Sequence, residues 1–150
     1  MALSANRVGL RLRNIKTRGS VVIKTSVTLY HHGLTVINAA GKGIPAANAT
    51  TTYFAGLCDI RYPDRATDGI VGDGTKEVDT IEECEAFLPI AAAVTVGIGV
   101  GAALYAVDDD TVTNATTLGP EIGTLASVPG SEVSGYAWVK LRAKGLSKAS

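Results

Sequence analysis

The chain has 150 residues, of which 46% are hydrophobic and 19% charged, so one soluble domain with a single sizeable core is expected, and collagen-like or wholly disordered chains are excluded. Aromatic residues make up only 5% of the positions and glycine occurs 17 times, a balance that favours short strands and tight turns over deep aromatic pockets. The formal net charge is zero, which argues against a general nucleic-acid coat protein.

Residues 1–19 are expected to form an extended basic arm. Side chains of an extended chain alternate between two faces, so the apolar residues of the arm would share one face and its arginines the other. Such an arm could add a strand to the sheet edge of a neighbouring molecule while its arginines pair with acids. A tail that stays disordered until it is bound is the alternative. The residues expected to bind a partner are Arg7, Val8, Leu10, Arg11, Leu12, Arg13, Lys16 and Arg18.

Residues 20–141 are expected to form a β-barrel or β-sandwich domain. The alternation of apolar and polar residues from Val21 to Leu29 predicts a half-buried strand that ends at a turn. Glycine, proline and aspartate separate the later apolar stretches, and no stretch has the period of a long capped helix. The further strands expected are Leu34–Ile37, Thr51–Leu57, Lys76–Ile81, Ala86–Ile90, Ala92–Val96, Ala102–Val107, Glu121–Ala126 and Gly135–Leu141.

Two stretches are expected to lie outside the strands. Residues 61–76 are rich in aspartate and glycine and predict one long exposed loop. Residues 142–150 predict a flexible basic tail.

The 22 residues from Ala86 to Val107 carry no charge, which is long enough for a membrane-spanning helix. Pro89 and three glycines interrupt the stretch, however, and both flanks are acidic where basic anchors would be expected. Buried strands joined by a glycine-rich bend fit better, and no membrane association is expected. The basic start is not followed by a signal-peptide pattern, so an intracellular origin is expected.

Several motifs that could form sites favour a plain structural interpretation. Residues 97–102 match the spacing of a dinucleotide-binding fingerprint, but the pattern of a following helix is missing, so a glycine-rich β bend is expected. Asp108, Asp109 and Asp110 are expected to form a solvated hairpin turn rather than a cation site. Glu82, Glu83 and Glu85 are expected to be solvated or to face a basic neighbour.

The histidines and cysteines also predict no catalytic or metal site. His31 and His32 are expected at a turn, with side chains on opposite faces that cannot hold one metal ion together. Cys58 and Cys84 are expected to be buried free thiols. The sequence therefore predicts no enzyme, no cofactor, no metal and no small-molecule substrate.

Charge is strongly segregated along the chain. Residues 1–58 hold seven lysines and arginines and no acid, residues 59–132 hold all 14 acids against three bases, and the last eighteen residues add four bases. The basic ends are therefore expected to approach an acidic surface: the middle of the same chain, a neighbouring copy, another protein or a nucleic acid.

Five stretches follow one another in the second half of the chain: Ala86–Pro89, Val100–Tyr105, Asp108–Thr113, Glu121–Ala126 and Ala137–Leu141. In order and spacing they resemble the head decoration (capsid cement) proteins of tailed bacteriophages. Upstream, Tyr53–Leu57 resembles the family's apolar strand that runs into a glycine before a long variable loop. The resemblance covers roughly residues 50–141, and the order of the motifs carries it, since each alone is only a strand-and-turn pattern. The basic start before residue 34 departs from the family's usual short beginning.

The resemblance implies a small β-barrel or β-tulip domain, without a cofactor, on the outer surface of a virion. The domain would be made in the host cytoplasm, form dimers or trimers, and tie adjacent major capsid protein subunits together against the internal pressure of DNA. Two other classes remain: another virion component, such as a head–tail joining or tail protein, and a nucleic-acid-binding β-barrel. Sparse aromatics and an acidic middle argue against the last, so direct DNA binding is not expected.

Overall fold

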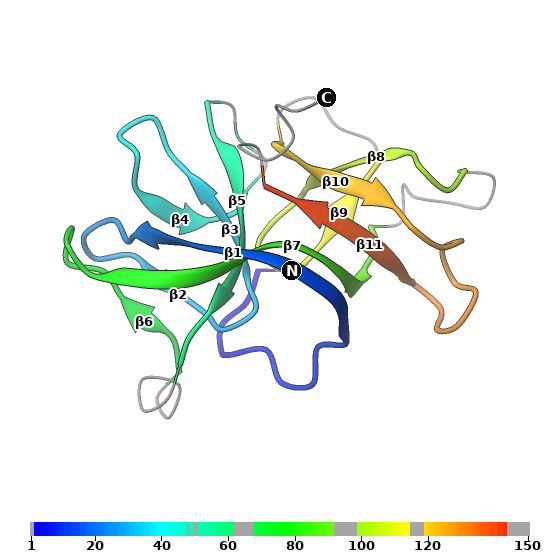
Figure 1. The fold of residues 1–150 in the computed structure, drawn as a ribbon, viewed down its shortest axis with the longest axis horizontal. Coiled ribbons are helices and arrows are strands. Elements are labelled where there is room, and N and C mark those ends of the chain that lie inside the picture. Colours follow the sequence, from blue (N-terminus) through cyan, green and yellow to red (C-terminus); the bar gives the residue numbers. More distant parts are fainter. Residues whose placement is uncertain are drawn as a thin grey trace.

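The computed structural model describes residues 2–47, 49, 51–61, 68–91, 99–114 and 119–143. In these ranges the fold is all-β, as the sequence predicts, with eleven strands and no helix (Figure 1). The described residues thus contain no helix able to cross a membrane. The strands are β1 (Leu12–Val22), β2 (Thr28–Leu29), β3 (Leu34–Ile37), β4 (Gly43–Pro45), β5 (Tyr53–Asp59), β6 (Ile70–Val71), β7 (Glu77–Pro89), β8 (Ala103–Ala106), β9 (Val112–Thr113), β10 (Glu121–Leu125) and β11 (Tyr136–Arg142).

The long strand β7 organises the main sheet. One edge of β7 pairs with β1 over most of its length, while the other edge pairs with β5 at residues 79–81 and with β11 at residues 83–89. The sheet therefore divides at β7 into two halves, in the order β4-β3-β5-β7-β11-β10-β8-β9, with β1 beside β7. All of these ladders are antiparallel, and β2 and β6 form a separate two-stranded sheet.

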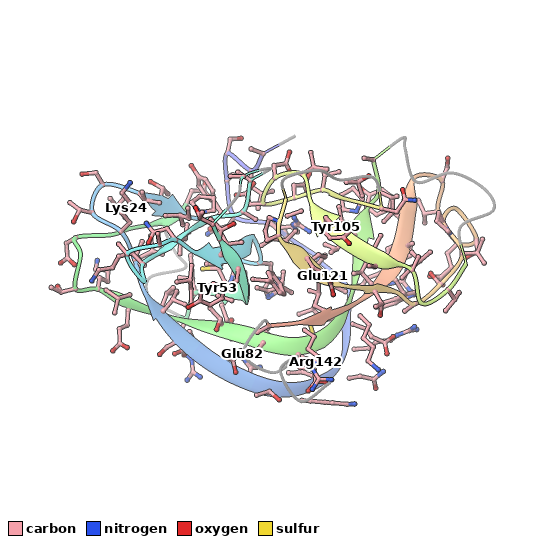
Figure 2. All side chains as sticks on the ribbon, turned by 90° about the horizontal axis from the view of Figure 1, so that it is seen from above. Lys24, Tyr53, Glu82, Tyr105, Glu121 and Arg142 are labelled. Atoms are coloured by element: carbon pink, nitrogen blue, oxygen red, sulfur yellow. The ribbon has the colours of Figure 1, made fainter. Side chains whose placement is uncertain are left out.

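Both halves of the sheet curl strongly, and Figure 2 shows from above the arc that β1 (blue) and β7 (green) make. In one half, Gly43 of β4 forms a parallel bridge with Ile23, which directly follows β1. In the other half, Val112 of β9 forms a parallel bridge with Ile90, which directly follows β7. The result is a strongly curled, barrel-like sheet, in agreement with the small barrel that the sequence predicts.

Two glycines permit close backbone approach within this curl. Gly56 in β5 and Gly123 in β10 have φ angles of 126° and 154°, and both lie where their strand shifts register against a neighbour. A Cβ atom at Gly56 would lie 2.5 Å from the carbonyl oxygen of Ile81, and one at Gly123 would clash with the carbonyl oxygen of Lys140. A larger residue would therefore separate the strands at either position.

The main apolar core joins the two halves of the sheet, because it takes side chains from β3, β5 and β7 as well as from β8 to β11. A smaller cluster packs on the opposite face of β5 and includes Ile23, Leu29, Cys58 and Ile60. Burying a large apolar side chain stabilises the fold by about 1.5–3 kcal/mol. The large side chains buried in the main core include Phe54, Leu57, Leu88, Leu104 and Leu141.

The continuous strand predicted from Val21 to Leu29 is wrong. β1 ends at Val22, and the chain turns before the short strand β2. The amide of Val27 donates a hydrogen bond of 3.2 Å to the carbonyl of Lys24, and Ser26 has a positive φ of 62°. Val21 and Leu29 are nevertheless buried, because an alternating pattern records which side chains reach the core and not whether the backbone between them stays extended.

The two strands predicted at Lys76–Ile81 and Ala86–Ile90 are one continuous strand, β7. The glutamates between them do not interrupt it, because their half-buried side chains can reach solvent or arginines at the surface of the sheet. The strands expected around β3, β5, β8, β10 and β11 are confirmed with ends that differ by no more than two residues.

The predicted loop and tail are only partly loop and tail. Within residues 61–76, Ile70 and Val71 form β6 and pair with β2. At the C-terminal end, Arg142 completes β11, and Ala143 is buried with its amide bonded to the carbonyl of Glu82. The expected strand Ala92–Val96 and the rest of the tail lie outside the described residues.

Candidate functional site

The predicted basic arm lies on its own chain. Residues 12–19 form the first part of β1 and pair with β7, so the boundary expected at residue 19 falls inside a strand. Residues 2–11 lead up to this strand (Figure 1). They contact the β8–β9 hairpin and the turn at His31. Strand addition, which the sequence suggested for a neighbouring molecule, is made here within one chain.

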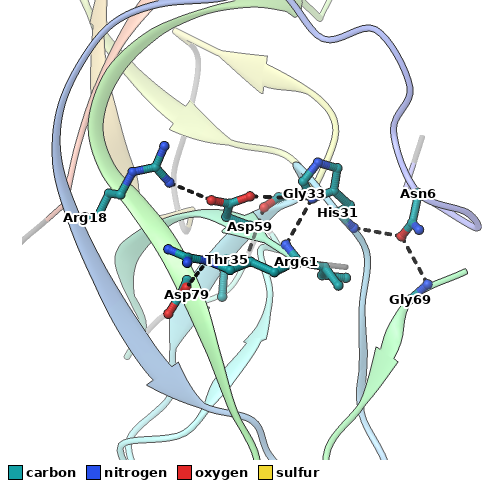
Figure 3. A network of polar contacts seen from close by, with 10 residues as sticks. Asn6, Arg18, His31, Gly33, Thr35, Asp59, Arg61, Gly69 and Asp79 are labelled. Carbon is teal, nitrogen blue, oxygen red and sulfur yellow. Dashed lines mark hydrogen bonds and ion pairs between the residues drawn. The ribbon is translucent and has the colours of Figure 1, made fainter. Parts of the chain in front are cut away.

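Asn6 anchors the start of this segment between two turns. Its Oδ1 accepts hydrogen bonds from the amides of His31 and Gly69, at 2.9 and 3.0 Å (Figure 3). Its own amide donates to Oδ1 of Asp68 at 3.2 Å. One short side chain therefore joins three chain segments that are far apart in sequence, a role that its position in a basic arm did not indicate.

Arg7 is the buried cation of the segment, with a side chain only 10% exposed. Its Nη2 lies 2.8 Å from Oδ1 of Asp110 and donates to the main-chain oxygen of Asp109 at 3.1 Å. Burial lowers the pKa of Arg7, and the charge of Asp110 opposes that shift. Isolated burial of a charge is costly, so the aspartates of the hairpin are what allow Arg7 to lie there.

Asp109 corrects the expectation that the three hairpin aspartates are solvated. The turn itself is present between β8 and β9, but Asp109 is 3% exposed and its Oδ1 accepts the amide of Leu3 at 2.7 Å. Burial raises the pKa of the Asp109 carboxyl, while the hydrogen bond from Leu3 opposes the rise. The hairpin is therefore a docking site for the N-terminal segment.

Arg11 and Arg13 lie on aromatic rings at the junction of β7 and β11. The Cζ atom of Arg11 is 4.7 Å from the ring centroid of Phe87, and that of Arg13 is 3.8 Å from the ring centroid of Trp138. Phe87 also stacks on Tyr136, with centroids 5.5 Å apart. Cation–π contacts of this kind contribute about 0.5–1 kcal/mol at exposed sites. Trp138 is buried.

The charge segregation of the sequence is resolved largely within the chain. Of the acidic surfaces considered, the middle of the same chain is the one that the arm contacts. The hydrogen bond from Arg13 lowers the pKa of Glu85, which makes the first part of β1 complementary to the acidic stretch of β7. The ion pairs of the arm are Arg7–Asp110, Arg11–Glu132, Arg13–Glu85 and Arg18–Asp59.

The apolar residues of the arm do not share one face. Val8 is 92% exposed, whereas Leu10 and Leu12 pack against the main core. Gly9, between Val8 and Leu10, has a φ of 76°, and such a residue breaks the alternation of an extended chain. Lys16 is exposed in the middle of β1. The structure thus brings Arg7, Arg11, Arg13 and Arg18 to acidic partners and leaves Val8 and Lys16 at the surface.

His31 and His32 lie at a turn, as expected, but their rings stack with centroids 3.8 Å apart instead of pointing apart. His32 has a positive φ of 62°, which removes the strand alternation that the expectation assumed. Ligand atoms of both histidines and Asp59 lie within 4.8 Å of one another. However, Nδ1 of His31 accepts the amide of Ile60 at 3.0 Å and Asp59 accepts a hydrogen bond from Arg18 (Figure 3). In this structure His31 and Asp59 therefore belong to a hydrogen-bond network.

The two cysteines are buried free thiols, as expected. Burial raises the pKa of Cys58 and of Cys84 to about 12. Because the thiolate is the reactive form, neither cysteine is poised as a nucleophile near neutral pH.

The outer edge of β1 is the longest exposed strand edge in the described part of the chain. No described strand pairs with it between Leu12 and Ser20. Lys16 is exposed there, and Ile15 is 43% exposed. The edge is not flat, because β1 shifts register twice against β7 and Asn14 has a φ of 54°. We refer to residues 12–20 as the β1 edge, since unpaired main-chain groups on such an edge can pair with another chain.

The chain was compared with protein-family models, with curated proteins and with solved structures, and none of these comparisons finds a match.

Proposed function

We propose that this protein is a structural component of a phage virion that binds the outside of the capsid and cements adjacent major capsid protein subunits. In this role its partners are the major capsid protein and further copies of itself, as a dimer or a trimer. It uses no substrate and no cofactor, and it stabilises the head against the pressure of the packaged DNA.

The observation that carries the proposal is the place of the stretches that resemble capsid cement proteins. They are not scattered over the molecule, because they form β5 and the end of β7, and then β8, the turn into β9, β10 and β11. From β7 onward these strands are neighbours in one half of the sheet. A succession of motifs that folds into one continuous unit supports a shared architecture more strongly than the same motifs would in isolation.

A cement protein needs broad contacts and not a deep pocket. A clip that binds the closed lattice better than separated subunits stabilises that lattice through the difference in affinity. Many identical sites on one shell multiply a modest contact at each site. A small, curled, all-β domain with an exposed strand edge meets these requirements.

The β1 edge is the surface that we assign to the capsid. It is long and carries basic side chains, and no described strand other than β7 pairs with it, so an extended segment of the capsid protein can add as a further strand. A nucleic-acid role has less support, because four arginines of the arm already pair with acids of the same chain and are less available to phosphates.

Electron microscopy of purified phage particles from the producing cells tests the proposal. Density for the chain is expected on the outer surface between capsomers, and particles stripped of the protein should break at lower temperature than particles to which it has been restored. Mature particles that contain no copies of the chain would refute the proposal.

The β1 edge can be tested separately by adding the purified protein to stripped particles. Ile15→Asp places a charge on the edge and should reduce occupancy, whereas Val71→Asp, at a similarly exposed position on β6, should not. Equal occupancy of both variants would remove the edge from the contact while leaving the function itself open to the microscopy.

A further inference from the structure

The N-terminal segment consists of an anchored part and a loosely packed part. Residues 2–7, which we call the plug, are anchored by hydrogen bonds of Leu3 and Asn6 and by the ion pair of Arg7. Residues 8–10, which we call the bridge, connect the plug to β1. Val8 in the bridge is 92% exposed, and a Cβ atom placed on Gly9 would have no atom within 4 Å.

Two clefts lie between the bridge and the body of the domain. One, of about 200 Å³, lies between the segment and the aromatic end of β7, and its lining includes Phe87 and Tyr136. The other, of about 340 Å³, lies toward the turn at His31 and His32. Residues 7–10 line both clefts. Val8 and Gly9 therefore gain little from packing against the body and can change direction at low cost, whereas Leu10 packs against the main core and fixes the end of the bridge.

The place that the plug occupies is a complete binding site formed by other parts of the chain. Its polar groups come from the turn at His31, from Asp68 and Gly69 before β6, and from Asp109 and Asp110 in the β8–β9 hairpin. These groups recognise two side chains and several main-chain amides of one short sequence. Nothing in them requires that the sequence belong to the same molecule.

We propose that the plug is exchangeable between copies, so that residues 2–7 of one molecule occupy the plug site of a second molecule. This inference deepens the proposed function and rests on it, because it names a second copy as the partner that links neighbouring cement molecules on the shell. Exchange of an identical element is a low-cost route to association, since each hydrogen bond that the plug breaks in its own molecule forms again in the other.

The balance between closed and exchanged forms is set by local concentration. The plug makes the same hydrogen bonds in both forms, so their contributions cancel, and the closed form competes with an effective concentration in the millimolar range for a short flexible connection. Dilute molecules are therefore closed. Copies held side by side exchange, provided that their plug sites lie near each other, because the extended chain from Arg7 to Leu10, which stays packed against the core, spans about 10 Å.

Cysteine pairing tests this in solution with the full chain. A Cβ atom at Gly33 would lie 3.2 Å from Cδ1 of Leu3, so the side chains at these positions are in contact, and the double variant below tests whether cysteines there reach disulfide geometry. Molecules with Leu3→Cys alone are mixed with molecules with Gly33→Cys alone and are then oxidised. The native thiols are buried and do not compete. Exchange predicts a disulfide-linked heterodimer whose yield rises about tenfold between 0.1 and 1 mM protein.

Two controls complete the pairing experiment. Val128→Cys mixed with Gly33→Cys gives the background of random encounter, since Val128 is exposed and outside the plug. The double variant Leu3→Cys, Gly33→Cys should close within one molecule at low concentration. A heterodimer yield at the background level overturns the exchange, and a double variant that does not close overturns the plug geometry on which it stands.

A second measurement avoids substitution at Gly33. A chain that lacks residues 2–7 is titrated with a labelled synthetic peptide of residues 2–9, and saturable binding at or below about 1 mM is expected. The same peptide with Arg7→Ala should bind about tenfold more weakly, because it loses a charge-assisted hydrogen bond. If the shortened chain folds and takes up no peptide, the exchange is overturned. Neither result affects capsid binding, which is measured on particles.

Discussion

The plug and β1 are adjacent in sequence, but different forces hold them. β1 is held by an antiparallel backbone ladder along β7, which depends little on side-chain charge. The plug has no ladder, and its contacts are individual hydrogen bonds and one buried ion pair. β1 should therefore fold with the domain, whereas the plug should respond to single side chains and to pH. The basic arm thus has one part that belongs to the sheet and one part that can leave it.

The largest expected effect comes from proline substitutions in β1, which test both its ladder with β7 and its free outer edge. Gly19 and Ser20 are consecutive residues of β1, so the amide of one faces β7 and the amide of the other faces outward. Proline at the inward-facing position removes a ladder hydrogen bond and should lower the free energy of unfolding by about 3 kcal/mol. Proline at the outward-facing position should cost much less, because edge positions tolerate it. Urea unfolding of the two variants measures the difference.

The two proline variants control each other once the Cβ at residue 19, which would clash with the carboxylate of Glu82, is accounted for by Gly19→Ala. A large and equal loss in both would contradict a free outer edge, because it would mean that both amides are bonded in the folded protein. A small loss in both would contradict the ladder to β7.

The next largest effect is local to the plug. Arg7→Ala removes the ion pair with Asp110 and the hydrogen bond to the carbonyl of Asp109, and loss of such a bond costs about 1–3 kcal/mol. Amide exchange of residues 2–8 should become fast, while exchange in β1 and β7 should stay slow. Mass-spectrometric hydrogen exchange measures both regions in one sample. If β1 loosens together with the plug, the two regions are one unit and the comparison fails.

The sequence indicated the ladder-held region better than the plug. Apolar alternation and turn residues predicted β3, β5, β8, β10 and β11, because those patterns reflect burial on one face of a sheet. The segregation of charge along the sequence indicated that the basic arm approaches an acidic surface, and the middle of the same chain was one of the possibilities. It could not show which acidic residue pairs with which arginine. Asn6 and Asp109 were missed as anchors, since their partners are at least twenty-five residues away and no local pattern encodes such a contact.

The acids beside the two regions should respond to pH in opposite directions. Arg13 lowers the pKa of Glu85 beside β1, so ionised Glu85 stabilises the fold above its ordinary pKa of about 4.3, and this contribution is lost as the pH falls through the lowered pKa. Burial raises the pKa of Asp109 beneath the plug. Its ionisation therefore costs stability as the pH rises from about 3.9 through the raised value.

Two variants separate these contributions. As the pH rises from about 3 to about 7, the stability of Glu85→Gln should fall relative to the unsubstituted protein, whereas that of Asp109→Asn should rise relative to it. The asparagine keeps an oxygen that can accept the amide of Leu3, so the plug can stay in place. Denaturant midpoints at several pH values give both trends. Trends of the same sign would contradict the opposite pKa shifts of Glu85 beside β1 and Asp109 beneath the plug.

The smallest effects belong to the two arginines at the boundary between the regions. Arg11 and Arg13 are both about half exposed, so their ion pairs contribute little, and each substitution to glutamine should cost about 0.5–1 kcal/mol. Arg13 lies nearer to Trp138, at 3.8 Å against 5.1 Å for Arg11, so Arg13→Gln should shift the tryptophan fluorescence more. Arg11 follows the bridge directly, so Arg11→Gln should instead increase plug exchange in the cysteine-pairing experiment. If Arg11→Gln shifts the tryptophan fluorescence more than Arg13→Gln and leaves plug exchange unchanged, the plug does not end before Arg11. The boundary between plug and strand then lies at a later residue.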